Sequence, residues 1–278
     1  MDAFRPGERC VDASGVEVAL PERALRIVSL VPSVTETLFA LGLGERVVGV
    51  TDWCIHPADA LVGVARVRGT KNPDCARIAE LAPDLVLANV EENREVDVRR
   101  LRERGITVWV DYPRTVADAL AQVRALARLG PPASARDAIV EPIERALRAA
   151  DARRTSGERP VRAFVAVWKD PWMTIGRDTY AHDLLARAGI DNVFADADGR
   201  YPRVTLEEVA ARDPELVLLP DEPYRFTDAD AQELASGALA GTSAARRGRV
   251  RVVDGTLAFW PGPRTARALA MLRSLARA

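Results

Sequence analysis

The chain has 278 residues, 48% hydrophobic and 28% charged, which is long enough to bury one large core or two ordinary ones. Its 39 Lys and Arg residues balance 40 Asp and Glu residues, and the net charge of −1 argues against nucleic acid or an anionic membrane as a partner. Three cysteines without paired spacing, Cys10, Cys54 and Cys75, do not indicate a disulfide framework.

The N-terminal segment has no apolar stretch of the kind that a signal peptide needs. No later run approaches the roughly 18 apolar residues of a membrane span. From the sequence as written we expect a cytoplasmic, monomeric protein that is not inserted in a membrane. A true start further upstream would instead place it in the periplasm or another extracytoplasmic space.

Buried strands alternate with amphipathic helices in the first part of the chain. Ser33 or Thr35 is a candidate N-cap of the first helix, with Glu36 completing a capping box and Gly42 or Gly44 ending the helix. Continuous apolar strands between helices predict a parallel sheet covered on both faces. The expected strands are 26–30, 47–50, 85–88 and 107–110, and the expected helices are 33–41, 75–81 and 96–104.

Strand signals disappear between Thr115 and about Arg154, where Ala, Leu and Arg recur at helical spacing. Pro131 and Pro132 break this pattern, after which Ser134 can cap a second helix with a kink at Pro142. A new series of strands begins at 163–168.

The second half repeats the first, because Pro83-Asp84-Leu85-Val86-Leu87 is echoed by Pro214-Glu215-Leu216-Val217-Leu218. In both copies a helix ends at a proline, and an acidic residue leads into a buried strand. The fold class that we predict is α/β, with two similar lobes of mainly parallel sheet joined by a long backbone helix. The expected parts are an N-terminal lobe at 1–114, a helical connection at 115–159 and a C-terminal lobe at 160–278.

Aromatic residues gather where the predicted strands end, which is where open parallel sheets bind ligands. Only 5% of residues are aromatic, yet four of the five tryptophans fall at such positions, whereas Trp109 lies inside a strand and is expected in the core. Trp53, Trp172 and Trp260 fit a cleft better than a core, and Trp168 fits either. Large rings bury wide flat surface at little entropic cost, which suits a cleft that holds a macrocycle or another extended ligand.

Catalytic and metal-binding patterns are sparse. The chain lacks Gly-x-Ser-x-Gly, His-Glu-x-x-His and a phosphate-binding glycine loop, so we expect no catalytic residues, although Glu91 and Glu92 could serve as acid and base. Only His56 and His182 could join Cys54 at a protein-made metal site, and three or four convergent ligands are needed. We therefore expect neither a resident metal nor a covalent cofactor.

Three segments carry a family resemblance. Residues 12–21 followed by 26–33, then Gly49-Val50-Thr51-Asp52, and the Pro-acid-Leu-Val-Leu strands resemble periplasmic substrate-binding proteins for iron-siderophores, haem and cobalamin, the helical-backbone metal receptors. The resemblance covers nearly the whole chain. It implies two α/β lobes, a rigid connecting helix, a shallow cleft between the lobes and delivery of the ligand to an ABC-type permease.

The resemblance also suggests residue roles. Cobalamin-binding relatives have an aromatic cleft and dock the permease through one acidic residue on each lobe. Glu207 matches the second acidic residue, whereas the first falls at Ala76.

Taken together, these features predict reversible binding of a metal chelate, with a corrinoid first and a ferric siderophore or haem next, by a protein that is not an enzyme. The alternatives are a cytoplasmic sensor or carrier of a non-metal ligand, and an enzyme acting on a tetrapyrrole or metal chelate. The expected ligand contacts are Pro32, Ser33, Asp52, Trp53, Asn89, Glu91, Tyr112, Trp168, Trp172, Arg177, Glu222, Tyr224 and Trp260.

Overall fold

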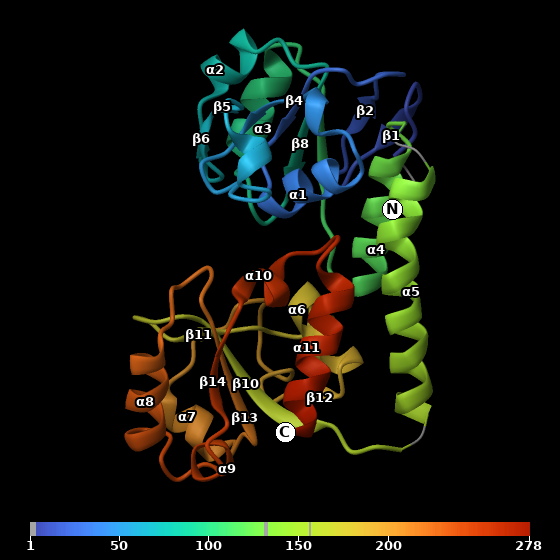
Figure 1. Cartoon of the computed structure of the whole chain (residues 1–278). Coiled ribbons are helices and arrows are strands. Elements are labelled where there is room, and N and C mark those ends of the chain that lie inside the picture. Colours follow the sequence, from blue (N-terminus) through green and yellow to red (C-terminus); the bar gives the residue numbers. More distant parts are fainter. Residues whose placement is uncertain (1–3, 131–132, 156) are drawn as a thin grey trace. The chain divides into compact units, whose positions relative to one another are not determined.

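The computed structural model describes residues 4–130, 133–155 and 157–278, which pack into two compact units (Figure 1). Unit 1 comprises Met1–Pro113, Ala117–Pro142 and Pro261–Pro263, and unit 2 comprises Arg114–Val116, Ile143–Trp260 and Arg264–Ala278. Within the described ranges, none of the helices combines the length and apolar character needed to cross a membrane.

Unit 1 is built on a five-stranded parallel sheet in the order β5-β4-β3-β8-β9 (Figure 1). All residues of β8, an interior strand of this sheet, are buried, so both faces of the sheet are covered here, as its continuous apolar sequence predicts. The strands of this sheet are β3 (Ile27–Ser29), β4 (Val47–Val50), β5 (Ala65–Arg66), β8 (Leu85–Asn89) and β9 (Val108–Asp111).

Two short helices and two small hairpins surround this sheet. Helix α2 (Cys75–Glu80) and helix α3 (Glu95–Glu103) pack on one face through Ile78, Val98 and Leu101, which join a core with Val86 and Val108. The hairpins pair β1 (Arg9–Val11) with β2 (Glu17–Ala19), and β6 (Arg68–Gly69) with β7 (Asn72–Pro73). The 3-10 turns are η1 (Gly44–Arg46) and η2 (Asp59–Leu61).

The first helix, α1 (Pro32–Ala40), begins earlier than its sequence predicts. Its N-cap is Val31 without a side-chain cap, and Pro32 stands in the first turn, where its fixed φ favours a helix start. Ser33 and Thr35 therefore lie inside the helix, so the predicted cap and capping box are wrong. The predicted stop is present, because Gly42 follows the C-cap with φ of 76°.

The helical stretch after unit 1's sheet forms α4 (Val116–Ala127) and α5 (Ala133–Thr155). Helix α5 is 23 residues long with Pro142 in its interior, and the boundary between the two units falls directly after this proline. The predicted break at Pro131 and Pro132 lies outside the described residues.

Unit 2 repeats the parallel architecture with one antiparallel addition. Strand β10 pairs in parallel with β12 and β13, β13 pairs in parallel with β14, and β11 runs antiparallel to β10 (Figure 1). The α/β fold class with two parallel-sheet lobes is thus confirmed. The strands are β10 (Val161–Trp168), β11 (Met173–Thr174), β12 (Ile190–Asn192), β13 (Leu216–Pro220) and β14 (Val250–Val253).

Helix starts in unit 2 are fixed by polar caps. Thr205 and Thr227 each form a capping box with the residue three positions on, Glu208 and Asp230, and so satisfy backbone groups at the helix start. The core of this unit includes Phe164, Val217 and Leu234 among its buried residues. The helices are α6 (Tyr180–Arg187), α7 (Leu206–Ala211), α8 (Asp228–Ser236), α9 (Ser243–Arg246), α10 (Gly255–Phe259) and α11 (Thr265–Arg277).

Candidate functional site

The expected ligand contacts of unit 1 follow the carboxyl ends of its parallel strands, but they differ in exposure. Pro32, Ser33 and Asn89 are buried, whereas Asp52 is exposed and Trp53 is 66% exposed. The Ser33 carbonyl accepts a hydrogen bond from the Thr37 hydroxyl at 2.8 Å. The exposed contacts therefore lie in the loop after β4. Glu91 and Tyr112 are half-buried.

Cys54 anchors the loop that exposes Trp53. Its sulfur lies 3.1 Å from both the Thr35 and Thr51 hydroxyl oxygens, and the residue is 0% exposed. Arg66 donates to the carbonyls of Thr51 and Cys54, at 2.9 Å each. Burial raises the pKa of the Cys54 thiol, which keeps it neutral. The neighbouring Trp53 and Ile55 then point outward, at 66% and 50% exposed.

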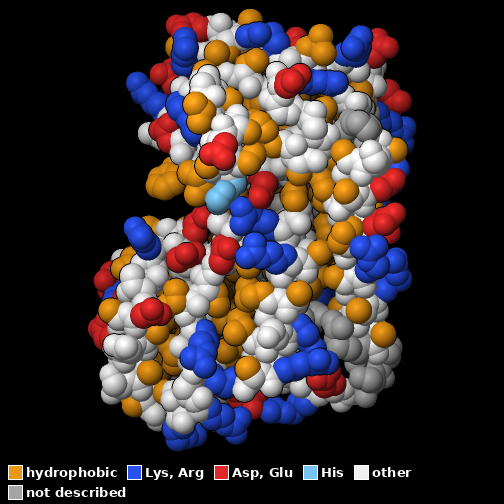
Figure 2. Space-filling view, viewed as in Figure 1, with side chains coloured by type: hydrophobic (Ala, Val, Ile, Leu, Met, Phe, Trp, Pro, Cys, Tyr) orange, Lys and Arg blue, Asp and Glu red, His pale blue; other side chains and the backbone are white. Residues whose placement is uncertain are grey.

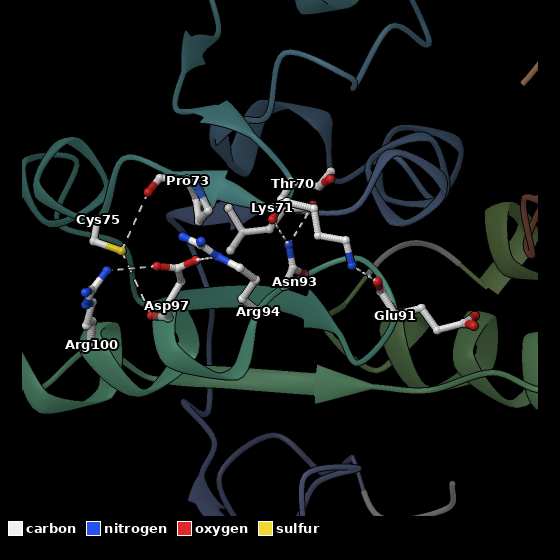
Figure 3. Close-up of polar contacts among 10 residues, drawn as sticks. Thr70, Lys71, Pro73, Cys75, Glu91, Asn93, Arg94, Asp97 and Arg100 are labelled. Carbon is white, nitrogen blue, oxygen red and sulfur yellow. Dashed lines mark hydrogen bonds and ion pairs between the residues drawn. The ribbon is translucent and has the colours of Figure 1, made fainter. Parts of the chain in front are cut away.

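Asn93 joins three segments at this edge of unit 1 (Figure 3). Its Oδ1 accepts from the Asn89 backbone N–H at 2.9 Å, and its Nδ2 donates to the Thr70 carbonyl at 3.0 Å and the Leu30 carbonyl at 3.4 Å. Asn93 is 5% exposed, so these contacts are protected from water. Sequence reasoning missed this residue, because a single asparagine after a strand carries no distinctive signal.

The loop around Asn93 is held at two further points (Figure 3). Lys71 donates to the Glu91 carbonyl, and the Glu91 N–H donates to Asn89 Oδ1 at 2.7 Å. Asp97, 2% exposed, pairs with Arg94 at 2.7 Å and Arg100 at 3.3 Å. Asn89 and Glu91 thus contribute to the shape of the edge through contacts within the chain.

A cavity of about 460 Å³ in unit 1 lies between the β1–β2 turn, α3 and the ends of β8 and β9. Four valines line it together with polar side chains, among them Glu95, Arg99 and Arg102. Arg102 is already engaged, because it pairs with buried Asp12 and donates to the Val108 carbonyl at 3.0 Å. Arg102 therefore serves the fold of unit 1 at the wall of this cavity.

Unit 2 carries four aromatic rings in contact where β10 and β13 end, and we call these the aromatic cluster: Trp168, Trp172, Tyr224 and Phe226. Trp168 meets Tyr224 edge-on with ring centroids 5.4 Å apart, and Tyr224 lies 4.6 Å from Phe226. Trp172 stacks on Phe226 at 5.7 Å with an interplanar angle of 12°. Phe226 is 2% exposed and anchors the cluster, while Trp168 is 41% exposed. The cluster thus presents aromatic surface to solvent.

Charged groups fix one side of the aromatic cluster. Lys169 lies 5.9 Å from the centroid of Trp172 and pairs with Asp230 at 2.9 Å and Glu233 at 3.2 Å. The hydrogen bond to Asp230 holds the pKa of Lys169 above its usual range. These ion pairs connect the end of β10 to α8, so the Lys169 ammonium group stabilises the fold of unit 2. Arg177 is exposed elsewhere in unit 2.

Trp260 takes a different position from the one that its sequence predicts. It follows the short helix α10 instead of a strand, is 5% exposed, and donates from Nε1 to Glu222 Oε1 at 2.9 Å. A buried indole cannot offer a ring face to a ligand, so the structure assigns Trp260 to holding Glu222. Burial raises the pKa of the Glu222 carboxyl, and Asp221 and Asp254 raise it further.

Metal binding by the protein itself has no support in the described parts of the chain, where no three His, Cys, Asp or Glu residues are placed to hold one ion. Cys54 is buried against Thr35 and Thr51. Burial lowers the pKa of His182, whose Nδ1 is buried without a hydrogen-bond partner. The Cys54–His56–His182 alternative is therefore set aside.

Comparison with known proteins decides the family, because the sequence model of the periplasmic binding proteins matches residues 27–257. The chain belongs to the periplasmic binding protein family. This family consists of binding proteins and not enzymes, which confirms both the resemblance and the expected absence of catalysis.

Several relatives have informative names. The vitamin B12-binding protein of Vibrio cholerae is 26% identical over 200 residues, 72% of each chain. YvrC of Bacillus subtilis, an uncharacterized ABC transporter substrate-binding lipoprotein, is 30% identical over 259 residues, which cover 91% of this chain and 80% of that one.

Solved structures of the family match the fold. BtuF, the periplasmic vitamin B12-binding protein of V. cholerae, has a TM-score of 0.78 at 24% identity, covering 91% of this chain and 97% of its own. The periplasmic haem-binding protein RhuT from Roseiflexus has a TM-score of 0.76 at 25% identity, covering 90% and 98%.

Proposed function

We propose that this periplasmic binding protein binds a corrinoid of the cobalamin type reversibly, as the substrate-binding component of an ABC importer. The observation that carries the proposal is the aromatic cluster of unit 2, an anchored group of rings at the edge where parallel sheets bind ligands. The vitamin B12-binding relatives and the transporter lipoprotein relative support the ligand class and the role.

The side chains that we propose as ligand contacts match the chemistry of a corrinoid. Trp168 and Tyr224 offer ring surface to the apolar body of a corrin, and the anchored rings beneath them lose little entropy on binding. Unit 1 has an exposed ring of its own, the indole of Trp53. Asp52 and Arg177 are exposed polar partners for the ligand's side chains. Binding is non-covalent, with the metal belonging to the ligand.

The test is a tryptophan-fluorescence titration of the purified protein with cyanocobalamin, dicyanocobinamide, haemin and a panel of ferric siderophores. We expect saturable quenching by the two corrinoids and weaker or no response to the others. Trp172→Ala, which removes the ring stacked on Phe226, and Trp53→Ala, which removes an exposed indole, should each raise Kd about tenfold. Val62→Ala, which shortens an apolar side chain that is 83% exposed, is the control and should leave Kd unchanged. Saturable binding of haemin or a siderophore alone would replace the corrinoid with that ligand.

We also propose that the protein is an extracytoplasmic monomer that delivers its ligand to a permease. Glu207 is exposed on α7, so its carboxylate is available to a basic partner. The Thr205 capping box fixes the start of this helix. In the host cell, Glu207→Ala should reduce uptake of radiolabelled cyanocobalamin while Kd stays unchanged. Unchanged uptake would remove Glu207 from the docking surface. A protein that fractionates with the cytoplasm would favour a carrier or sensor.

A further inference from the structure

The segment after β13 carries a carboxyl group, that of Glu222, two residues before Tyr224 of the aromatic cluster. Strand β13 lies between β10 and β14, and all three run parallel, so their carboxyl ends share one edge of the sheet. Trp168 ends β10, and Glu222 stands two residues after β13 and two before Tyr224. The proposed ligand surface therefore includes Glu222 at its border.

The carboxyl group of Glu222 is held in place by its surroundings. Its Oε1 accepts from the buried indole N–H of Trp260 at 2.9 Å. Its backbone packs on Gly255 so closely that a Cβ there would lie 2.6 Å from both N and O of Glu222. The adjacent Asp221 accepts from the Gly255 N–H at 2.7 Å. A carboxyl that is held by an indole N–H, on a backbone packed against Gly255, is preorganised to meet one feature of a ligand.

The charges around Glu222 are mainly negative. Asp221 and Asp254 raise its pKa, and their own oxygens are bound to the Gly255 and Thr256 backbone N–H groups at 2.7 and 3.0 Å. Arg264 opposes this effect, but its guanidinium also donates to the Thr256 hydroxyl and lies 5.5 Å from the centroid of Trp260. A negatively charged ligand group that approached Glu222 would be repelled by these carboxylates, and partial burial strengthens the repulsion.

We propose that Glu222 selects the ligand by charge: its carboxyl accepts hydrogen bonds from amide or amine N–H groups at the ligand's edge and disfavours a carboxylate there. This inference rests on the proposed function and narrows its ligand class to macrocycles whose side chains are amides and not acids. Trp260 is a positioning residue, because it acts on the ligand only through Glu222.

The test compares cyanocobalamin with its monocarboxylic acids. In each acid, one peripheral amide of cyanocobalamin has been hydrolysed to a carboxylate. At pH 7 we expect the wild-type protein to bind cyanocobalamin about tenfold more tightly than at least one of these acids, as one lost charge-assisted hydrogen bond would cause. Glu222→Gln keeps the acceptor for Trp260 and removes the charge, so the preference against that acid should fall below about twofold. Asp198→Asn, which neutralises an exposed carboxylate elsewhere in unit 2, should retain the full preference.

A second variant separates positioning from folding. Trp260→Phe keeps the buried ring but removes the N–H donor, so the pKa of Glu222, followed by NMR, should rise and the preference should weaken. Charge selection would be overturned if the wild type bound cyanocobalamin and all of its monocarboxylic acids with equal affinity. An unchanged preference in Glu222→Gln would overturn it as well, and either result would leave corrinoid binding intact. No binding of cyanocobalamin at all would overturn the proposed function and this inference together.

Discussion

At the scale of single residues, the structure separates the exposed candidate contacts from the buried ones. Asn89, Ser33 and Trp260 are buried, while Trp53 and Trp168 are exposed at similar places in the sequence pattern. The sequence predicted that aromatic and polar residues gather at strand ends. It could not predict which of them turn inward, because that depends on partners distant in sequence, such as Glu222 for Trp260.

Asn93 tests whether a buried side chain at this edge of unit 1 stabilises the fold through its hydrogen bonds. Asn93→Ala removes one acceptor and two donor contacts in a buried position, so we expect the free energy of unfolding to fall by about 3 kcal/mol. Urea denaturation followed by circular dichroism measures this change. Asn72→Ala, at an exposed asparagine in the adjacent hairpin, is the matched control and should cost much less. Equal losses in the two variants would contradict the role of Asn93.

Glu222 should leave a signature in the pH dependence of stability. Its pKa is raised by burial, so the folded protein binds this proton more tightly than the unfolded chain does. The resulting stabilisation is complete below about pH 4.3, the unfolded value, and is lost as pH rises through the folded pKa. The free energy of unfolding of the wild type should therefore fall relative to Glu222→Gln between pH 4 and pH 7. A difference that stays constant over this range would show that the carboxyl is not perturbed.

At the scale of elements, the strands of unit 1 could be predicted because each is a short apolar run bounded by helices. The start of α1 could not, since Ser33 and Thr35 match a capping signature while Pro32 initiates the helix before them. The hydroxyl of Thr35 instead donates to the Ser29 hydroxyl at 2.8 Å, inside the core. A local signature failed here because buried neighbours offered the hydroxyl other partners.

Helix α7 depends on its capping box and carries Glu207. Thr205→Ala removes the side-chain acceptor for the Glu208 N–H, and we expect a loss of about 1 kcal/mol in the free energy of unfolding. Thermal denaturation measures it, with Ser236→Ala at the end of α8 as a control. A loss no larger than that of the control would show that the box contributes little.

Helix α5 contains a proline that should cost stability. Pro142 cannot donate to the helix ladder, so Pro142→Ala should raise the free energy of unfolding by about 1–3 kcal/mol. The melting temperature from circular dichroism would report this gain. A lower melting temperature in the variant would mean that the helix needs the proline at this position.

At the scale of the whole molecule, the repeated Pro-acid-Leu-Val-Leu segment predicted two similar lobes, and the parallel sheets of the two units confirm that fold class. The ligand class follows less directly, because the same fold occurs in vitamin B12-binding and haem-binding proteins. Only the chemistry of the site distinguishes such ligands. The aromatic cluster and the carboxyl of Glu222 are the features on which we propose a large apolar macrocycle with amide side chains.

Native mass spectrometry of the purified protein with cyanocobalamin shows whether one chain holds one corrinoid without a covalent bond. We predict a monomeric complex heavier than the protein by one cyanocobalamin, which loses the ligand under denaturing conditions. The complex should become much less abundant in Trp172→Ala at the same ligand concentration. Free protein alone at saturating cyanocobalamin would contradict the account.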